Sequence, residues 1–433
     1  MKYTAPHKNL FIRNRRNFSG KMKPGTIALF FSNDLVSTSN SDTLHPFQQN
    51  SNTYWLTGLD QEEIILFLFP DAPKPEWKEV AFIKRTNEKI QIWEGWKYSK
   101  EEATEAAGIT TIKYSDEFDT LLRSFLSYSE GIYLDFNEYE RNSFFAPSPA
   151  HRFCERLKTE WPAIPVLRSA PVLRDLRLVK SEEEQLQMRL AASITEKAFR
   201  RVLGFVKPGV WEYEIEAEIM HEFLLNRANG PAYSSIVASG KNACVLHYIL
   251  NNAQTRDGQF LLMDFGADYG NYSADLSRSI PVNGKFSSRQ KDIYNACLRV
   301  FKSSRAIMVP GQTFEELNKK TGEFMTEELL QLGLITQEQV DNQNPEMPAY
   351  KRYFMHGTSH HLGLDTHDIT HRYKAFEPGM VLTCEPGIYI PEEGIGVRIE
   401  NDILITENGN EDFMKEIPIE VEEIEELMKS RMN

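Results

Sequence analysis

The sequence predicts a mixed α/β (α+β) protein with two domains. Short apolar segments typical of strands alternate with amphipathic segments typical of helices, and Gly, Pro and Asp residues separate them. A length of 433 residues allows two or three domains with sizeable cores. A proline-rich passage and then a helix start signal lie near residue 172, so we expect a smaller domain at 1–172 and a larger one at 173–433.

The first domain contains four segments with the length and apolar content of β-strands. These segments are TIALFF (26–31), TYWLTGL (53–59), EIILFLF (63–69) and EVAFIK (79–84). EEATEAAGI (101–109) and residues 118–126 are helical in character. We therefore expect a sheet accompanied by helices in this domain.

The second domain begins with Ser181 and Glu184, which have the spacing of a capping box at the start of a long amphipathic helix. That helix, Pro208-Gly209 and a second helix are echoed further along by a helix, Pro310-Gly311 and another helix. Strand-like segments rich in His, Asp and Glu follow each pair. If this repeat is structural, the domain has two similar halves with a site along the seam between them.

Four carboxylates lie in or beside apolar, strand-like segments, where an ionised group is costly to bury. Asp264 ends FLLMD, Asp275 lies in YSADLS, Glu385 follows MVLTC and Glu400 ends GVRIE. The turn signal YGNY at 269–272 would set the first two carboxylates side by side on adjacent antiparallel strands. Either these groups face water or they share a positive charge.

Two divalent cations would neutralise the four carboxylates, which would otherwise repel one another. Oxygen ligands with one imidazole suit Mn²⁺, Co²⁺ or Zn²⁺. Six of the ten His residues fall between 247 and 371, in the same part of the chain. Each residue alone has a simpler interpretation, such as a solvated Asp in a hairpin or two exposed His, His356 and His360, on one helix face. Their joint occurrence favours a metal site.

Several segments resemble the metal-ligand motifs of the aminopeptidase P and prolidase group, which belongs to the pita-bread metallopeptidases. They are MDFGADYGNYSADLSRSIPVNGKF, HGTSHHLGLDTHD, EPGMVLTCEPGIYI and GVRIENDILIT. RNRRNFSGKMKPGTIALFF and HPFQQNSNTYWLTGLDQEE resemble the N-terminal domain of aminopeptidase P. The resemblance implies a C-terminal pita-bread catalytic domain of two pseudo-symmetric halves, preceded by a smaller mixed α/β domain concerned with assembly and access to the site.

The resemblance also assigns site residues. It implies two divalent metal ions per subunit, with Mn²⁺ expected before Co²⁺ or Zn²⁺, and their ligands are Asp264, Asp275, His360, Glu385 and Glu400. Asp275 and Glu400 would bridge the two ions. The catalytic residues that it implies are Glu385 as proton carrier, His367 and His247. The residues implied for the pocket of the substrate's second residue are His356, Tyr389 and Arg398.

The implied activity is that of a Xaa-Pro aminopeptidase, which releases the N-terminal residue from peptides with proline in second position. A prolidase acting on Xaa-Pro dipeptides is the alternative, because the segment between Glu385 and Glu400 is short and leaves the preferred peptide length open. Methionine aminopeptidase is disfavoured because it lacks such a large N-terminal domain. A non-catalytic binding protein on the same fold is disfavoured because all five ligand positions are present.

The composition indicates which classes of partner and which cellular compartment to expect. A net charge of −13 argues against a nucleic-acid partner. We expect no membrane association, since apolar runs are shorter than a membrane span. Four Cys residues without paired spacing favour a reducing compartment, and we expect the cytoplasm. We interpret the basic residues before Asp34 as one face of a first helix rather than an organellar transit peptide.

The resemblance implies a homo-oligomer, a dimer or a tetramer, in which the N-terminal domains pack between subunits. Trp93, in IWEGW, lies where a relative could offer an aromatic side chain to a neighbouring active site. A place in the core of its own domain is the expected role for this residue.

Overall fold

The computed structural model describes residues 2–40, 42–139 and 146–429. The chain divides into two compact units, one spanning Ala5–Arg177 and the other comprising Met1–Thr4 and Leu178–Asn433. Position 172, where we expected the domain boundary, lies inside helix α7 (Ala170–Arg177). Among the described residues, none of the helices has both the length and the apolar content needed to span a bilayer.

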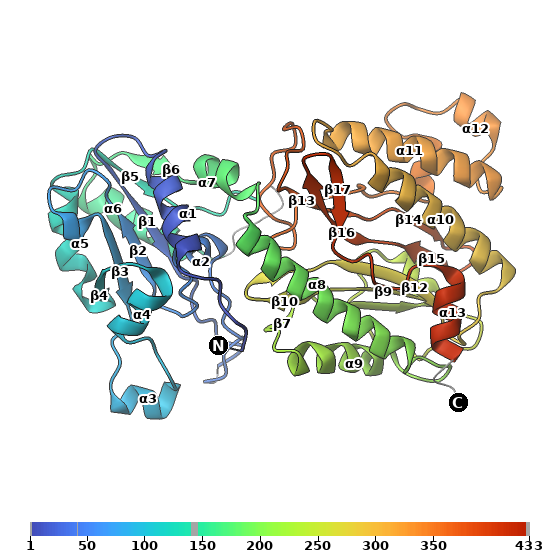
Figure 1. Ribbon diagram of the computed structural model, residues 1–433, viewed down its shortest axis with the longest axis horizontal. Helices are drawn as coiled ribbons and strands as arrows, with labels where there is room; N and C mark the ends of the chain where they lie inside the picture. The colour runs from blue at the N-terminus through green and yellow to red at the C-terminus, as the bar shows by residue number, and fades with distance from the viewer. Residues whose placement is uncertain (1, 41, 140–145, 430–433) are drawn as a thin grey trace. The chain divides into compact units, whose positions relative to one another are not determined.

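The described part of the unit at 5–177 contains a six-stranded sheet with the order β4-β3-β2-β1-β5-β6 (Figure 1). Its strands are β1 (Thr26–Phe31), β2 (Ile65–Leu68), β3 (Glu79–Ile83), β4 (Thr111–Tyr114), β5 (Gly131–Leu134) and β6 (Val166–Arg168). The accompanying helices are α1 (Asn9–Ser19), α2 (Ser51–Thr57), α3 (Glu88–Glu94), α4 (Lys100–Ala107), α5 (Phe118–Leu126), α6 (Pro149–Glu160) and α7. Sheet and helices share a core in which Phe67 of β2 stacks on Phe125 of α5 with ring centroids 3.9 Å apart.

The prediction of a strand at 53–59 is wrong, because residues 53–57 belong to helix α2 and residues 58–59 follow its end. The Asn50 side chain accepts hydrogen bonds from the backbone N–H groups of Asn52 and Thr53, which caps the start of the helix. Gly58 ends it in the left-handed conformation at φ 67°. A short apolar run buried on all sides has the same composition in a helix as in a strand, so the caps determine the outcome.

Trp93 is also placed differently from our expectation. It lies in α3 with 81% of its surface exposed, and Ile92 beside it is 79% exposed. The prediction of a core tryptophan is therefore wrong.

The unit beginning at Leu178 contains two similar halves (Figure 1). The first half has helices α8 (Glu182–Leu203) and α9 (Glu212–Leu225) with a sheet β12-β9-β8, formed by β8 (Ile236–Ser239), β9 (Phe260–Phe265) and β12 (Leu276–Pro281). The second half has helices α10 (Ser288–Ala306) and α11 (Phe314–Gln331) with a sheet β13-β16-β17, formed by β13 (Val381–Cys384), β16 (Asn401–Thr406) and β17 (Gly409–Asp412). The predicted fold class is confirmed, and α8 begins at the expected capping box of Ser181 and Glu184.

Smaller elements complete this unit. They are β7 (Gly230–Pro231), β10 (Ala267–Tyr269), β11 (Tyr272–Ser273), α12 (Gln337–Asp341), β14 (Gly387–Ile390), β15 (Ile395–Arg398) and α13 (Val421–Lys429). The predicted turn joins β10 to β11, and Gly270 and Asn271 both have the positive φ of a type I′ turn, 62° and 65°. The chain thereby reverses between β9 and β12, which pair antiparallel.

Candidate metal centre

Strand ends bring the carboxylates together. Asp264 is near the end of β9 and Asp275 directly precedes β12, its antiparallel partner. Glu385 directly follows β13 and Glu400 directly precedes β16, again an antiparallel pair. In each pair the end of one strand lies beside the start of the other, so each sheet contributes two carboxylates. A bridge between Ser277 and Glu400 joins the two sheets at this place.

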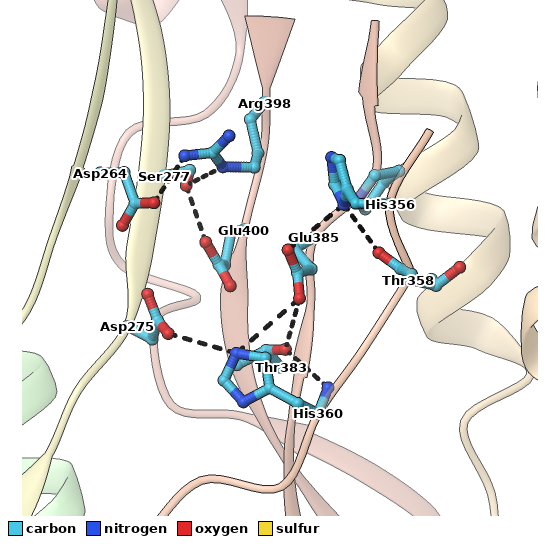
Figure 2. Close-up of polar contacts among 12 residues, drawn as sticks. Asp264, Asp275, Ser277, His356, Thr358, His360, Thr383, Glu385, Arg398 and Glu400 are labelled. Carbon is cyan, nitrogen blue, oxygen red and sulfur yellow. Dashed lines mark hydrogen bonds and ion pairs between the residues drawn. The ribbon is translucent and has the colours of Figure 1, made fainter. Parts of the chain in front are cut away.

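The five predicted ligand residues lie in one cluster (Figure 2). Asp275, His360 and Glu400 offer ligand atoms that all lie within 4.8 Å of one another. Asp264 joins them through the hydroxyl of Tyr233, which lies 2.5 Å from Asp264 Oδ1 and 2.5 Å from Asp275 Oδ1. Glu385 joins them through His360, with 3.8 Å between Glu385 Oε1 and His360 Nε2.

Burial governs the electrostatics of this cluster. Asp275 and Glu400 are 4% and 2% exposed. Burial, followed by the charges of the neighbouring carboxylates, raises the pKa of Glu400 well above its usual range. Burial likewise raises the pKa of Glu385 to about 7, even though His360 and Arg398 lower it. The carboxyl groups therefore repel one another and need more positive charge than their protein neighbours supply.

The donor set fits divalent cations. The Tyr233 hydroxyl lies 2.5 Å from a carboxylate oxygen of Asp264 and 2.5 Å from one of Asp275, but it has one proton to donate. The other carboxylate oxygen therefore repels the hydroxyl oxygen unless a cation or a further proton lies close to them. The described cluster holds four carboxylates, one imidazole and the Arg398 guanidinium. Carboxylate oxygens with an imidazole nitrogen form the coordination shell that Mn²⁺, Co²⁺ and Zn²⁺ accept.

His360 is oriented as a metal ligand. Its Nδ1–H donates to the carbonyl oxygen of His361 at 2.9 Å, which leaves Nε2 to face Asp275 at 3.4 Å. Burial lowers its pKa, but the hydrogen bond to Asp275 and the charges of Glu385 and Asp275 outweigh burial and raise the pKa to about 9. The ring of His367, an exposed residue, stacks on His360 with centroids 4.1 Å apart.

The three residues predicted for the second-residue pocket contact one another. Arg398 Nη1 donates to the Tyr389 hydroxyl at 2.9 Å, and that hydroxyl lies 2.8 Å from His356 Nε2. Since His356 Nδ1 faces the Gly357 carbonyl at 2.8 Å, Nε2 is the acceptor for the Tyr389 proton. Burial and the charge of Arg398 lower the pKa of His356 to about 3, so the ring stays neutral.

Arg398 also reaches the ligands. Its Nη2 donates to Asp264 Oδ2 at 2.5 Å and its Nε donates to Ser277 Oγ at 2.8 Å. Ser277 in turn donates to Glu400 Oε2 at 2.7 Å. Nothing in the sequence singled out Ser277 or Tyr233, because an isolated Ser or Tyr in a strand-like segment has no motif of its own.

His247 lies in an exposed turn after the 3-10 helix Gly240–Cys244. Ala243 and Tyr248, on either side of His247 in sequence, share a buried cluster with Tyr389. His356, expected as one of two exposed His on a helix face in the simpler interpretation, is not in a helix.

Comparison with known proteins gives a consistent result. Residues 186–407 match metallopeptidase family M24, and residues 11–133 match the aminopeptidase P N-terminal domain. The chain is 36% identical over 432 residues to the Xaa-Pro aminopeptidase of Escherichia coli (strain K12), covering 96% of this chain and 97% of that protein. Its structure is similar to Pseudomonas aeruginosa aminopeptidase PepP, with 31% identity, a TM-score of 0.90 and 99% of each chain covered. It is also similar to E. coli aminopeptidase P with the inhibitor Pro-Leu, with 33% identity, a TM-score of 0.88, and 99% of this chain and 100% of that chain covered.

Proposed function

We propose roles for the site residues from the premise that this chain belongs to metallopeptidase family M24 and is a Xaa-Pro aminopeptidase. It is a hydrolase that releases the N-terminal residue from peptides with proline in second position. The observation that carries this function is the match to Xaa-Pro aminopeptidases over almost the whole chain, together with the five clustered ligand residues. The same match does not favour the prolidase alternative.

The metal ligands in this proposal are Asp264, Asp275, His360, Glu385 and Glu400, which would hold two divalent ions. The excess of buried carboxylates over protein cations supports this number of charges. When bound, such ions supply Lewis acidity, which makes water a nucleophile near neutral pH and polarises a carbonyl group. Mn²⁺ is the ion that we expect, since the donors are mainly oxygen.

Glu385 is proposed to transfer a proton from the attacking water to the departing proline nitrogen. Its Oε2 lies 3.5 Å from His356 Nδ1 and its Oε1 lies 3.8 Å from His360 Nε2, so the carboxylate lies between the ligands and the pocket residues. His367 is proposed to donate a hydrogen bond to the oxyanion that forms at the scissile carbonyl. Its exposed ring, stacked on His360, supports that position.

Proline in second position makes the scissile bond a tertiary amide without an N–H group. The site must therefore recognise the proline ring by shape and packing. We propose His356 as the residue that contacts the ring, with Tyr389 holding the orientation of the imidazole. His247 is proposed to contact the peptide on the exposed side of the same pocket, because it is exposed and its neighbours Ala243 and Tyr248 pack with Tyr389. In this arrangement Arg398 fixes both Tyr389 and Asp264.

Peptide assays test this function. The metal-loaded protein is expected to release the first residue from a dipeptide, a tripeptide and a pentapeptide with proline second, and to leave matched alanine-second peptides intact. A chelator should abolish the activity and added Mn²⁺ should restore it, because the proposed hydrolysis needs the Lewis acidity of the bound ions. Cleavage restricted to the dipeptide would instead establish a prolidase, and cleavage of none would exclude a peptidase of this type.

We further propose a homo-oligomer, a dimer or a tetramer, assembled through the unit at 5–177. The support is a group of exposed apolar side chains in and just after α3: Ile92 and Trp93 lie in the helix, and Trp96, at 53% exposure, follows it. Such side chains are usually covered by a partner. Light scattering at micromolar concentration should give a multiple of the 50.0 kDa chain mass, and Trp93→Asp should reduce it. A monomeric mass for the unchanged protein would exclude the oligomer.

We also propose that the protein acts in the cytoplasm. Four thiols, Cys154, Cys244, Cys297 and Cys384, are free in the structure, which suits a reducing compartment. Fractionation of the native host, followed by activity measurement, tests this location.

A further inference from the structure

A loop between β8 and β9 packs against Tyr389, one of the predicted pocket residues. We call residues 240–252 the His247 loop. Its residues Ala243 and Tyr248 pack in one buried cluster with Tyr389. On the other side of Ala243, Gly396 of β15 permits a close approach, because a Cβ there would lie 2.2 Å from the Ala243 carbonyl oxygen. The loop is therefore seated closely against the strand pair that carries Tyr389 and Arg398.

The outer side of the loop has little packing of its own. Val245, Ile249 and Leu250 are 54%, 58% and 71% exposed, and His247 is exposed among them. The outer side of the loop has few apolar contacts that could fix its shape, so polar contacts at its base contribute to its order.

Glu212 accepts five of those hydrogen bonds, and Asn251 makes others with Val237, Ser235 and Glu216. Glu212 is the first residue of α9 and is 0% exposed. Its Oε1 accepts hydrogen bonds from the Ser239 N–H at 2.7 Å, the Ser239 hydroxyl at 2.8 Å and Asn242 Nδ2 at 3.2 Å. Its Oε2 accepts from the Tyr248 hydroxyl at 2.7 Å and the Ala253 N–H at 2.9 Å. One carboxylate thus binds the backbone on both sides of the loop and two side chains within it.

The contacts require a carboxylate of this length. All five partners donate, and a carboxylate is the side chain that only accepts. In a glutamine, an NH₂ group would replace one of the two carboxylate oxygens and would face the groups that donate to that oxygen. At least one of the backbone hydrogen bonds, from Ser239 or from Ala253, would then be lost. An aspartate keeps the charge but is shorter by one methylene. The position at the start of α9 also favours a negative charge.

We propose that Glu212 is a positioning residue that joins the two ends of the His247 loop and thereby holds this loop, with His247 on it, in its place against Tyr389. This inference rests on the proposed function only for its effect on catalysis. The closure itself is a property of the folded chain and can be measured without a substrate.

A double-mutant cycle with Glu212→Gln, His247→Ala and the combined variant tests the proposal, and Glu218→Gln serves as the matched control. Glu218 lies on the same helix, pairs with Arg201 and has no role in the site. Hydrogen exchange should be faster at the Ser239 and Ala253 amides in Glu212→Gln by about tenfold or more, because each loses a charge-assisted hydrogen bond. Exchange in Glu218→Gln should equal that of the unchanged protein.

The kinetic half of the experiment uses a Xaa-Pro tripeptide with metal content measured in parallel. Glu212→Gln should lower kcat/KM about tenfold with unchanged metal content, and it should add little to the loss caused by His247→Ala, since both act at one position. The proposal would be overturned if Glu212→Gln lowered kcat/KM by the same factor in the unchanged protein and in His247→Ala. It would also be overturned if Glu212→Gln did not lower kcat/KM at all. Unchanged exchange at Ser239 and Ala253 would overturn it regardless of activity.

Glu212→Asp is the second variant if Glu212→Gln fails to fold. It should show the same changes in exchange and kcat/KM at smaller size, and an aspartate variant identical to the unchanged protein would count against the closure. Absence of Xaa-Pro activity in the unchanged protein would remove the proposed function while the exchange result still decides the role of Glu212.

Discussion

The guanidinium of Arg398 lies directly against the carboxylate of Asp264, with 2.5 Å between Nη2 and Oδ2. The same guanidinium reaches Glu400 through Ser277, whose hydroxyl accepts from Arg398 Nε and donates to Glu400 Oε2. Its remaining contact is with the Tyr389 hydroxyl. A guanidinium with these three partners is better placed to orient metal ligands than to bind the carboxylate end of a short peptide.

Arg398→Ala should therefore reduce metal content and lower kcat/KM equally on dipeptides, tripeptides and pentapeptides. Loss of a group that orients metal ligands typically costs about ten- to a hundredfold in metal affinity or activity. Elemental analysis and kinetics on the three peptide lengths measure this. Arg289→Ala, which breaks an exposed ion pair with Glu393, is the control. A loss confined to short peptides, with metal content unchanged, would instead identify Arg398 as the residue that binds the peptide carboxylate.

Asp275→Asn should abolish activity and remove both metal ions, whereas Asp264→Asn should remove chiefly one. The difference follows from the proposed ligand roles, since a bridging carboxylate serves two ions and a terminal one serves a single ion. Asp275 Oδ2 also lies 3.4 Å from His360 Nε2, closer than Glu385 Oε1 at 3.8 Å. Inductively coupled plasma analysis gives the metal per chain, and Asp257→Asn, at an exposed site bonded to Asn283, is the control. Two metals per chain in Asp275→Asn would show that it is not a bridging ligand.

The fold could be predicted where local patterns were sufficient. The segments at 26–31, 63–69 and 79–84 form β1, β2 and β3, and the capping box at Ser181 starts α8. The segment at 53–59 has only a short apolar run, Tyr54-Trp55-Leu56, which shows no period, so its conformation depends on the Asn50 cap and the left-handed Gly58. Trp93 is exposed because α3 does not pack on the sheet of its own unit (Figure 1). The composition of the segment does not predict this position.

The sequence also predicts some residues of the candidate site and misses others. Local motifs identified candidate ligands that the structure places in one cluster, because each of the four carboxylates lies at or next to a strand end in its own segment. Tyr233 and Ser277 could not be identified, since their contacts arise from register between segments. Ser277 lies opposite Asp264 in the β9–β12 pair and also bridges to Glu400. Such pairings become visible only when the strands are aligned in space.

Tyr233→Phe should weaken metal binding without unfolding the protein. The hydroxyl lies 2.5 Å from Asp264 Oδ1 and from Asp275 Oδ1, and burial followed by the charges of these carboxylates raises the pKa of Tyr233 well above its usual range. The group therefore stays protonated and orients both ligands. Loss of such a contact typically costs about ten- to a hundredfold in metal affinity or activity. Competition with a metal-sensitive dye measures the affinity. Tyr213→Phe, at an exposed position on α9, is the control, and equal affinities in both variants would contradict this role.

His361→Phe should make the protein less sensitive to acid. His361 is 1% exposed and packs edge-on against Phe314, and burial, followed by the charge of Lys180, lowers its pKa to about 3. Between this value and the ordinary pKa of 6.5, His361 is protonated in the unfolded chain but neutral in the folded chain. The free energy of unfolding therefore decreases as the pH falls through that range. Each bound proton contributes a slope of about 1.4 kcal/mol per pH unit. The phenylalanine removes that proton, so unfolding midpoints measured from pH 6 to pH 4 should fall less steeply than in the unchanged protein. His221→Gln, at a half-exposed position on α9, should follow the unchanged protein. Parallel curves for His361→Phe and the unchanged protein would mean that the folded state accommodates the proton on His361.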